Sequence, residues 1–459
     1  MRCASCWQGV FAWGLNLDSL VGTDLGMLAN HCYNHSKIMK NRLVLILISL
    51  LVFGPLRADF MVQPNDVVGI AGDSITEQHL YSAFMEDYLL MCQPTAGQKI
   101  VQFGWSPEQA PSFLARLNTD VLPFQPTVVT TCYGMNDGHY GPLDTVTADT
   151  YRKAQTAIVE ALKKAGVRGI VLGSSKCVDS YAYHGHNVEG AVVYNKTLGA
   201  MADIDREIAT KEGVVYADVY GATTDAMEKS KAKFGESYIF AGGDGVHPGP
   251  NGHLVMAYAF LKALGCDGNI GTITVGPGLD KAEATAGHEI VSCQAGTITV
   301  KSTRYPFCFT GALDSMDQNT TAAITQFFPF NEDLNRLTLV VKGLTSAKAK
   351  VTWGATTREY SAAELANGVN LAKDFLQNPF SDQFAKVNAA VEAQEAQETL
   401  LSKTFMHNMA EWKTNFAPGS DAVWDQIMDA GRKQHDALYQ TAAGLVVPIT
   451  HTITIAPEA

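Results

Sequence analysis

The sequence predicts an α/β domain, built on a parallel sheet covered by helices, followed by a smaller β-rich domain. Between residues 64 and 265, short β-branched runs alternate with helical stretches, which is the pattern of parallel strands joined by crossover helices. After Gly268 the segments instead alternate apolar and polar residues, as antiparallel strands do. A chain of 459 residues with 46% hydrophobic residues also exceeds the usual size of one domain, so two domains are expected.

The first domain contains five runs that we interpret as strands: 66–71, 99–103, 127–132, 168–173 and 214–219. Between the third and fourth runs, apolar residues recur at spacings of three and four from Tyr151 to Ala165, which predicts one buried face of a helix. Gly166 follows directly and is a typical helix stop.

In the second domain the expected strands are 271–275, 296–300, 337–341, 350–353 and 448–455. Residues 361–445 return to helical patterns, with breaks near Pro379 and Pro418. Because strands are expected on both sides of this stretch, we predict a small β-sandwich-like domain that carries a helical insertion. A helical block must bury its apolar face, so we expect it to pack on the first domain and help wall its active site.

The apolar run Leu43–Gly54 follows two basic residues, precedes small residues and is too short to span a bilayer. This layout predicts a signal peptide over 39–58 and an exported protein that starts near Asp59. Residues 1–38 are then an untranslated or misassigned extension, and an internal membrane anchor is the alternative. The domains are expected at 59–267 and 268–459, with no lasting membrane span once the signal is removed.

Charge and cysteine content limit the partners. The formal net charge of -12, without a basic cluster, argues against nucleic acid. Six cysteines follow residue 58, and export permits a disulfide, for which Cys293 and Cys308 are the best candidate pair. Cys132 ends an apolar strand and is expected to be a buried thiol.

The first chemically informative residue is Ser74. The run Val67–Ala71 leads straight into Gly72-Asp73-Ser74, and ligands of open α/β sheets bind outside the carboxyl ends of the strands. Ser74 therefore falls at the expected active-site position. Taken alone, a serine after a strand is equally explained as a helix N-cap.

Asp244 and His247 lie three residues apart on a loop before the last helix of this domain. That spacing lets a carboxylate accept a hydrogen bond from one ring nitrogen while the other faces a nucleophile. A neutral hydroxyl needs such a base to attack near neutral pH, so the pair completes a Ser-His-Asp set with Ser74. An ordinary loop histidine beside Pro248 is the alternative.

Two more strand ends supply hydrogen-bond donors. Gly104 follows the second strand, where the missing side chain lets a backbone N–H approach a ligand, and Asn136 follows the third. With the Ser74 N–H they provide three candidate donors to the oxyanion of a tetrahedral intermediate. Both residue types are also common in turns, which is the alternative reading.

These four segments, in this order, resemble the conserved blocks of the SGNH (GDSL-type) hydrolase family from near Pro64 to Cys266. The resemblance implies Ser74 as nucleophile and oxyanion donor, Gly104 and Asn136 as the other donors, His247 as base and Asp244 as its orienting acid.

The same resemblance implies a flavodoxin-like three-layer fold and neither a metal nor an organic cofactor. One departure is Gln102, where members often carry asparagine two residues before the block glycine, and this affects the assignment of Gly104.

Other polar clusters have competing interpretations. Asp244, His247 and His253 could ligate a metal together with Asp137 or His139, but their spacing does not compel the three converging ligands that a hydrolytic metal site needs. Aromatic and histidine side chains on loops at the Ser74 end of the sheet are candidates for stacking on sugars, with loop packing as the alternative; they are Trp105, Tyr133, His139 and Tyr183.

The expected function is a secreted serine esterase that works through an acyl-enzyme. Export and the accessory β-domain favour deacetylation of a polysaccharide or oligosaccharide. A lipase or thioesterase is the first alternative, because related folds carry many acyl hydrolases. A catalytically vestigial carbohydrate-binding protein is the second.

Overall fold

The computed structural model describes residues 59–184, 190–416, 419 and 421–458. The expected N-terminal extension and signal peptide lie outside these described residues. None of the helices within the described ranges has the length and apolar character that a membrane crossing requires.

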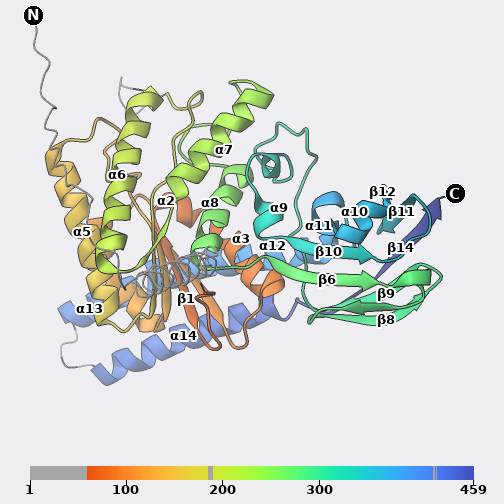
Figure 1. The fold of residues 1–459 in the computed structure, drawn as a ribbon. Coiled ribbons are helices and arrows are strands. Elements are labelled where there is room, and N and C mark those ends of the chain that lie inside the picture. Colours follow the sequence, from red (N-terminus) through yellow and green to blue (C-terminus); the bar gives the residue numbers. More distant parts are fainter. Residues whose placement is uncertain (1–58, 185–189, 417–418, 420, 459) are drawn as a thin grey trace, which may run out of the picture. The chain divides into compact units, whose positions relative to one another are not determined.

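A five-stranded, all-parallel sheet forms the centre of the first domain, with the order β2-β1-β3-β4-β5 (Figure 1). Its strands are β1 (Val67–Gly72), β2 (Lys99–Gly104), β3 (Val128–Cys132), β4 (Gly169–Gly173) and β5 (Val215–Ala217). The predicted parallel sheet is therefore confirmed, with strand ends within a few residues of the expected ones. The strand β5 stops early because the Asp218 carboxylate accepts the Gly221 N–H and caps the next helix.

Helices cover both faces of this sheet, because successive strand side chains point to opposite sides. One face packs on α4 (Ala110–Arg116), α5 (Thr145–Lys164) and α6 (Gly190–Glu212). The other packs on α3 (Tyr81–Asp87) and α8 (Pro250–Ala263), with α7 (Val219–Phe234) against α8. The helix predicted from Tyr151 begins earlier, since Asp144 caps it by accepting the Thr147 N–H.

The C-terminal region contains two further sheets. A four-stranded sheet has the order β13-β10-β6-β7, and a five-stranded antiparallel sheet has the order β12-β11-β14-β9-β8. Their strands are β6 (Asn269–Val275), β7 (Ala282–Ala284), β8 (His288–Gln294), β9 (Thr297–Ser302), β10 (Arg336–Val341), β11 (Lys348–Trp353), β12 (Thr356–Ser361), β13 (Val369–Asn370) and β14 (Ile449–Glu458).

The expectation of purely antiparallel pairing is wrong at one place, because β10 pairs with β6 in parallel. The 60-residue connection between these two strands is long enough to carry the chain back to the same end of the sheet. Shorter elements complete the fold: α2 (Ser74–Glu77), η1 (Tyr88–Cys92), η2 (Leu117–Val121), η3 (Leu122–Phe124), η4 (Pro277–Leu279), η5 (Ala323–Gln326), α9 (Phe330–Asp333), α10 (Ala362–Asn367) and α11 (Leu371–Asp374).

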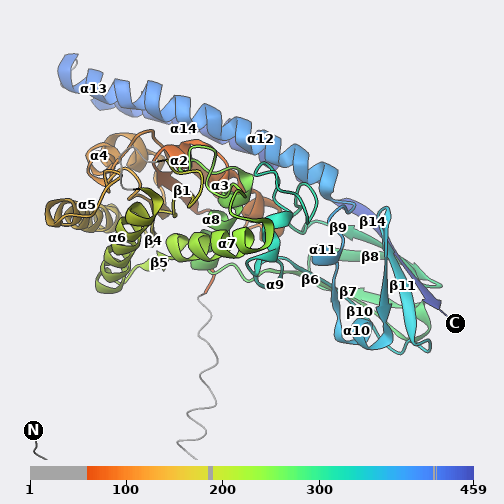
Figure 2. The same cartoon turned by 90° about the horizontal axis from the view of Figure 1, so that it is seen from above.

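Between β13 and β14 the chain forms the helices α12 (Ser381–Thr399) and α13 (His407–Phe416), the π-helical segment η6 (Leu400–Met406) between them, and α14 (Asp421–Ala443). We call these four elements the helical insert. It runs along the α/β domain (Figure 2), with α12 and α14 against the edge strand β2 and α12 against α3. The insert therefore covers a sheet edge that would otherwise be open to pairing. The short strand β13 falls inside the stretch that was expected to be helical.

The expected disulfide is wrong. Cys293 and Cys308 are both free thiols. The Cys308 Sγ lies 3.8 Å from the Asn378 Oδ1, whereas the Cys293 Sγ lies 3.5 Å from the Leu279 carbonyl oxygen. Cys132 is a buried thiol, as predicted.

An unusual group of buried carboxyls lies where the helical insert meets α3. Glu86 and Asp87 on α3 and Glu395 on α12 are all fully buried. Gln394 donates to Glu86 at 2.9 Å, Asn388 donates to Asp87 at 2.8 Å and Ser82 donates to Glu395. Burial raises the pKa of all three acids well above their ordinary range, and neighbouring carboxylates raise those of Glu86 and Glu395 further.

This burial predicts a pH dependence of stability. At these sites the folded protein holds protons that the unfolded chain releases above its ordinary carboxyl pKa values of 3.8 to 4.5. The free energy of unfolding should therefore fall as the pH rises from that range toward the raised values, by up to about 1.4 kcal/mol per pH unit for each group. In Glu395→Gln the fall measured by urea unfolding between pH 5 and 8 should be shallower than in the wild type.

The control is Glu160→Gln, which removes an exposed carboxylate of α5 outside this interface. Its pH profile should run parallel to that of the wild type. A Glu395→Gln profile that is also parallel would show that this carboxyl is ionised in the folded protein.

Candidate active site

Ser74 stands at the carboxyl end of the interior strand β1, as the first residue of α2. Asp73 caps this helix by accepting the Ile75 N–H at 2.9 Å. A Cβ at Gly72 would lie 2.1 Å from the Thr76 Oγ1 and 2.9 Å from the Cys132 carbonyl, so only glycine lets α2 follow the strand so closely. At the first helical position the Ser74 N–H has no acceptor within the helix and remains available to a ligand.

Two hydrogen bonds join Ser74, His247 and Asp244 in a chain. The Ser74 Oγ lies 2.9 Å from the His247 Nε2, and the His247 Nδ1 lies 2.7 Å from the Asp244 Oδ2. Because a carboxylate can only accept, the proton sits on Nδ1, and Nε2 is left to accept from the serine hydroxyl. The structure thus places side by side three residues that the sequence separates by up to 173 positions.

The loop from Gly242 to His247 is fixed by its own backbone. The Asp244 Oδ1 accepts the Val246 N–H at 2.8 Å and the His247 N–H at 2.9 Å. Gly242 has a φ of +88°, and a Cβ there would lie 1.8 Å from the His247 carbonyl oxygen. Burial alone would raise the pKa of Asp244, but the bonds from His247 and Val246 outweigh it and hold that pKa below its ordinary value. Asp244 is therefore ionised at neutral pH.

Asp179 anchors this loop from outside. Its Oδ2 accepts the N–H groups of Phe240 and Ala241 at 2.7 and 3.2 Å, and its own N–H donates to the Gly245 carbonyl at 2.9 Å. Lys231 lies 3.0 Å from the other carboxylate oxygen, with both side chains buried. The position of His247 thus depends on a buried ion pair that no sequence motif marks.

Asn136 is held by two partners on either side of its amide. Its Nδ2 donates to the Glu108 carbonyl at 3.0 Å, and its Oδ1 accepts from the Tyr140 hydroxyl at 2.7 Å. A carbonyl can only accept, so Glu108 fixes which end of the amide is nitrogen. The second Nδ2 hydrogen remains for an oxyanion.

The assignment of Gly104 as an oxyanion donor stays a prediction. In the structure its N–H donates to the Gln102 Oε1 at 3.0 Å, and this contact would have to break before the N–H could bind an oxyanion. A Cβ at Gly104 would lie 2.4 Å from the Glu77 nitrogen, so the glycine serves the close packing of β2 against α2. The Ser74 N–H and the Asn136 Nδ2 are the two donors of the predicted set that need no such change.

The four expected substrate contacts divide into different environments. The prediction that Tyr133 contacts the substrate is wrong, because its side chain is fully buried and its hydroxyl donates to the Glu108 Oε2 at 2.8 Å. Tyr183 is largely buried and stacks on Tyr194 with ring centroids 6.0 Å apart. His139 is exposed, and Trp105 is half-buried.

The helical insert contacts Trp105, which follows the carboxyl end of β2. Lys403 of η6 lies 4.9 Å from the Trp105 ring centroid and pairs with the Glu77 Oε1 at 2.7 Å. Glu77 is the last residue of α2, one turn after Ser74. Thr399 adds a 2.8 Å hydrogen bond to His79. Residues of the insert thus line the rim beside the candidate nucleophile.

His253 does not join a metal site with Asp244 and His247. Its Nδ1 accepts the Tyr81 N–H at 3.1 Å, and its Nε2 lies 3.2 Å from the Gln78 Oε1. Both ring nitrogens are occupied, and burial lowers the pKa of His253 to about 3. Over the described residues, no three His, Cys, Asp or Glu side chains are grouped as metal ligands.

The site also contains residues that sequence reasoning missed: Glu108, Asp179 and Lys403. The sequence also did not predict that Tyr140, four residues after Asn136, would bind the Asn136 amide. Lys403 lies 326 positions from its partner Glu77, and no local pattern connects them.

Comparison with known proteins identifies a family for the α/β domain. Residues 70–255 match the GDSL-like Lipase/Acylhydrolase family. No curated protein matches the chain in sequence. Among solved structures, a gut microbial diltiazem-metabolizing enzyme is 22% identical with a TM-score of 0.66, covering 87% of this chain and 99% of that chain.

Two further solved structures are similar to part of the chain. Axe2, an acetylxylan esterase from Geobacillus stearothermophilus, is 21% identical with a TM-score of 0.38, over 45% of this chain and 97% of that one. A putative GDSL-like lipase from Parabacteroides merdae is 21% identical with a TM-score of 0.38, over 45% of this chain and 98% of that one.

The α/β domain of this chain belongs to the GDSL-like lipase/acylhydrolase family, the SGNH hydrolases, and the protein is accordingly an ester hydrolase.

Proposed function

We propose that Ser74 is the nucleophile of this ester hydrolase, with His247 as its base and Asp244 as the acid that orients the ring. The supporting observation is the hydrogen-bonded chain from the Ser74 Oγ through the His247 ring to the Asp244 carboxylate, at 2.9 and 2.7 Å. Both lengths are those of well-formed hydrogen bonds, so proton transfer needs no rearrangement of the side chains.

In this mechanism the Ser74 Oγ attacks the ester carbonyl carbon while the His247 Nε2 takes the hydroxyl proton. The tetrahedral intermediate collapses when the alcohol leaves with that proton, and an acyl-enzyme remains on Ser74. Water then attacks the acyl-enzyme, with His247 again as base. The ionised Asp244 stabilises the imidazolium that forms twice in each cycle.

The negative charge of both intermediates is stabilised by the Ser74 N–H and the Asn136 amide. Both donors are held in place before substrate binds, which is the condition under which such groups lower a barrier most. Asp244 and its loop supply no donor to this oxyanion, because the Val246 and His247 N–H groups are already bound to the Asp244 carboxylate.

For the substrate we propose an acetylated polysaccharide or oligosaccharide. The support is the hydrophilic rim beside Ser74, where the Glu77–Lys403 ion pair, the half-buried Trp105 and the exposed His139 face the same end of the sheet. Such a rim favours a hydroxylated leaving group over a lipid chain. A lipase-like or thioesterase-like preference is the competing proposal.

Protein that begins at Asp59 separates these proposals. It should hydrolyse p-nitrophenyl acetate much faster than the octanoate and release acetate from acetylated xylan. Ser74→Ala should abolish both activities, whereas Ser112→Ala, an exposed serine on α4, should leave them unchanged. Faster turnover of octanoate would refute the short-acyl proposal and leave the triad intact. Glycan binding without any esterase activity in the wild type would favour the vestigial alternative.

Tyr140 gives a second test of the oxyanion site. Its hydroxyl holds the Asn136 Oδ1 at 2.7 Å, which fixes the amide and strengthens the Nδ2 donor. Tyr140→Phe should therefore lower kcat by about 5- to 12-fold with little change in KM, since one neutral hydrogen bond is worth about 1–1.5 kcal/mol. Affinity for a boronic acid that mimics the tetrahedral state should fall in parallel. A higher KM at constant kcat would instead assign Tyr140 to substrate binding.

Export is part of the proposal, supported by the signal-like segment 39–58. Expression of the full sequence in a secreting bacterial host should yield a processed protein whose first residue is near Asp59. Retention of the apolar segment in membranes would support the anchor alternative.

A further inference from the structure

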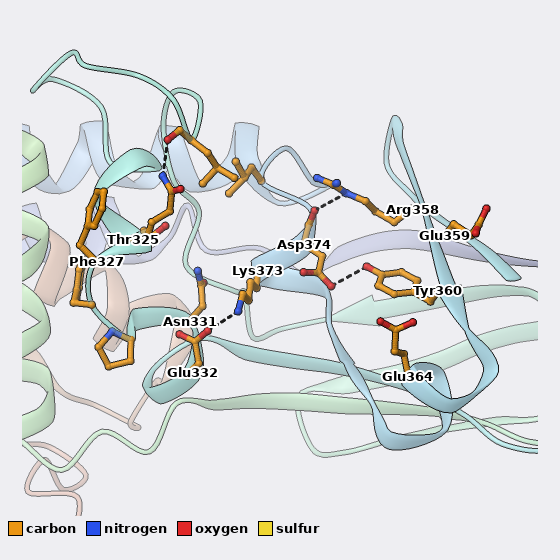
Figure 3. A pocket seen from close by; sticks show the side chains of 15 residues that line it. Thr325, Phe327, Asn331, Glu332, Arg358, Glu359, Tyr360, Glu364, Lys373 and Asp374 are labelled. Carbon is orange, nitrogen blue, oxygen red and sulfur yellow. Dashed lines mark hydrogen bonds and ion pairs between the residues drawn. The ribbon is translucent and has the colours of Figure 1, made fainter. Parts of the chain in front are cut away.

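The C-terminal region contains a cavity of about 870 Å³, within the size range of small-molecule sites (Figure 3). Its walls come from three separate stretches: 313–332, the strand β12 with the start of α10, and α11 with the residues just after it. Figure 3 shows Asn331, Lys373 and Asp374 between Phe327 at one end and Tyr360 at the other. We call this cavity the β-domain groove.

Carboxylates outnumber cations among the charged side chains of the β-domain groove. Lys373 lies 2.7 Å from the Glu332 carboxylate, and Asp374 accepts the Tyr360 hydroxyl at 2.8 Å. The Arg358 Nε donates to the Asp374 carbonyl at 3.1 Å, which leaves the guanidinium charge without an ion pair among the described residues. Glu359 and Glu364 also line the groove, so its excess of negative charge disfavours an anion, and the described residues contain no cluster of metal ligands. The chemistry of the groove therefore does not favour an ionic ligand.

These same groups keep unused hydrogen-bonding capacity. Among the described residues, the Arg358 Nη atoms, the Asp374 Oδ1 and the Asn331 Nδ2 have no protein partner. Asn331 is only 5% exposed, and Figure 3 shows its amide directed into the groove. Donors and acceptors of this kind, set among Phe327 and Leu313, suit neutral hydroxyl groups carried on a partly apolar ring.

One stretch of chain connects the β-domain groove with the candidate active site. Residues 313–329 supply the Phe327 wall, and within them the Gln318 carbonyl accepts the Asn251 N–H at 3.1 Å. Asn251 follows His247 by four residues. A ligand held in the groove is thus held by a segment that contacts the first turn of α8, just after the catalytic loop.

We infer that the β-domain groove is a second, non-catalytic binding site for a neutral oligosaccharide segment, which holds a polymeric substrate while Ser74 acts on it. The choice of a sugar as the ligand rests on the proposed function. The existence of a polar site for an uncharged ligand rests on the groove alone.

The experiment measures binding without catalysis. Full-length mature Ser74→Ala protein is run through native gels that contain soluble xylan, glucomannan, arabinogalactan or polygalacturonate. At least one of the three neutral polymers should retard it, and the double substitution Arg358→Ala, Lys373→Ala should weaken that retardation at least 5-fold. Lys350→Ala is the matched control, because Lys350 is an exposed lysine paired with Glu458 outside the groove.

A second arm uses the catalytically intact protein. The double variant should hydrolyse p-nitrophenyl acetate at the wild-type rate and show a several-fold higher KM for the acetylated form of the polymer that retards it, at constant kcat. Lack of retardation by every neutral polymer, retardation by polygalacturonate alone, or equal retardation of the double variant and Lys350→Ala would each overturn the inference. None of these outcomes bears on the triad, which p-nitrophenyl acetate reports separately.

Discussion

Replacing His247 by alanine is expected to lower kcat by about 10⁴- to 10⁶-fold, because the Ser74 hydroxyl then has no base within reach. Asp244→Asn should cost about 10⁴-fold, since the neutral amide no longer fixes the proton on Nδ1. Both rates are measured with p-nitrophenyl acetate in proteins whose thermal unfolding is shown to be unchanged.

Two features distinguish loss of a base from loss of structure. The double variant Ser74→Ala, His247→Ala should be no slower than either single variant, because the residues act as one unit. Added imidazole should partly restore His247→Ala but not Ser74→Ala. If the loss of kcat in the double variant equals the product of the two single losses, Ser74 and His247 do not act as one unit.

The second large effect concerns the oxyanion. With the Gly104 N–H bound to Gln102, Asn136 supplies one of the two identified donors, so Asn136→Ala should lower kcat by about 10²- to 10³-fold with little change in KM. Asn269→Ala, which removes an exposed asparagine at the start of β6, is the control. An Asn136→Ala enzyme within a few-fold of wild type would exclude the amide from the transition state.

Gln102 offers a direct check of whether Gly104 takes part in catalysis. The Gln102 side chain also donates to the Thr76 carbonyl at 2.8 Å, so it ties β2 to the helix that carries Ser74. If the Gly104 N–H plays no part in catalysis, its contact with Gln102 must persist when an acyl-enzyme analogue is bound. A structure of the protein with a phosphonate on Ser74 would show whether it does.

The parallel sheet and the Asp-His loop were predictable because they depend on local patterns. A β-branched run followed by Gly72-Asp73-Ser74 defines a strand end, and the order of the strands along the chain carries the other segments to the same edge. Asp244 and His247 contact each other within one short loop. Such short-range features can be recognised from the sequence itself.

Other features of the site depend on the direction of single polar groups or on contacts between distant segments, which no local pattern fixes. Nothing in the run from Gln102 to Gly104 reveals that the side chain turns back to the backbone N–H two residues later. Tyr133 follows β3 at the active-site end, but its ring packs on the side covered by α4 and α5, where Glu108 binds its hydroxyl. The Glu77–Lys403 contact joins two ends of the chain and depends wholly on how the helical insert folds back.

Covalent labelling of the protein with a fluorophosphonate tests the central claim most directly. Intact mass followed by peptide mapping should find a single phosphonyl adduct on Ser74, formed at a rate that drops by orders of magnitude in His247→Ala. Two results would contradict the assignment of Ser74 as the nucleophile. One is an adduct on another residue, and the other is a protein that keeps its full esterase activity in the fluorophosphonate while Ser74 stays unlabelled.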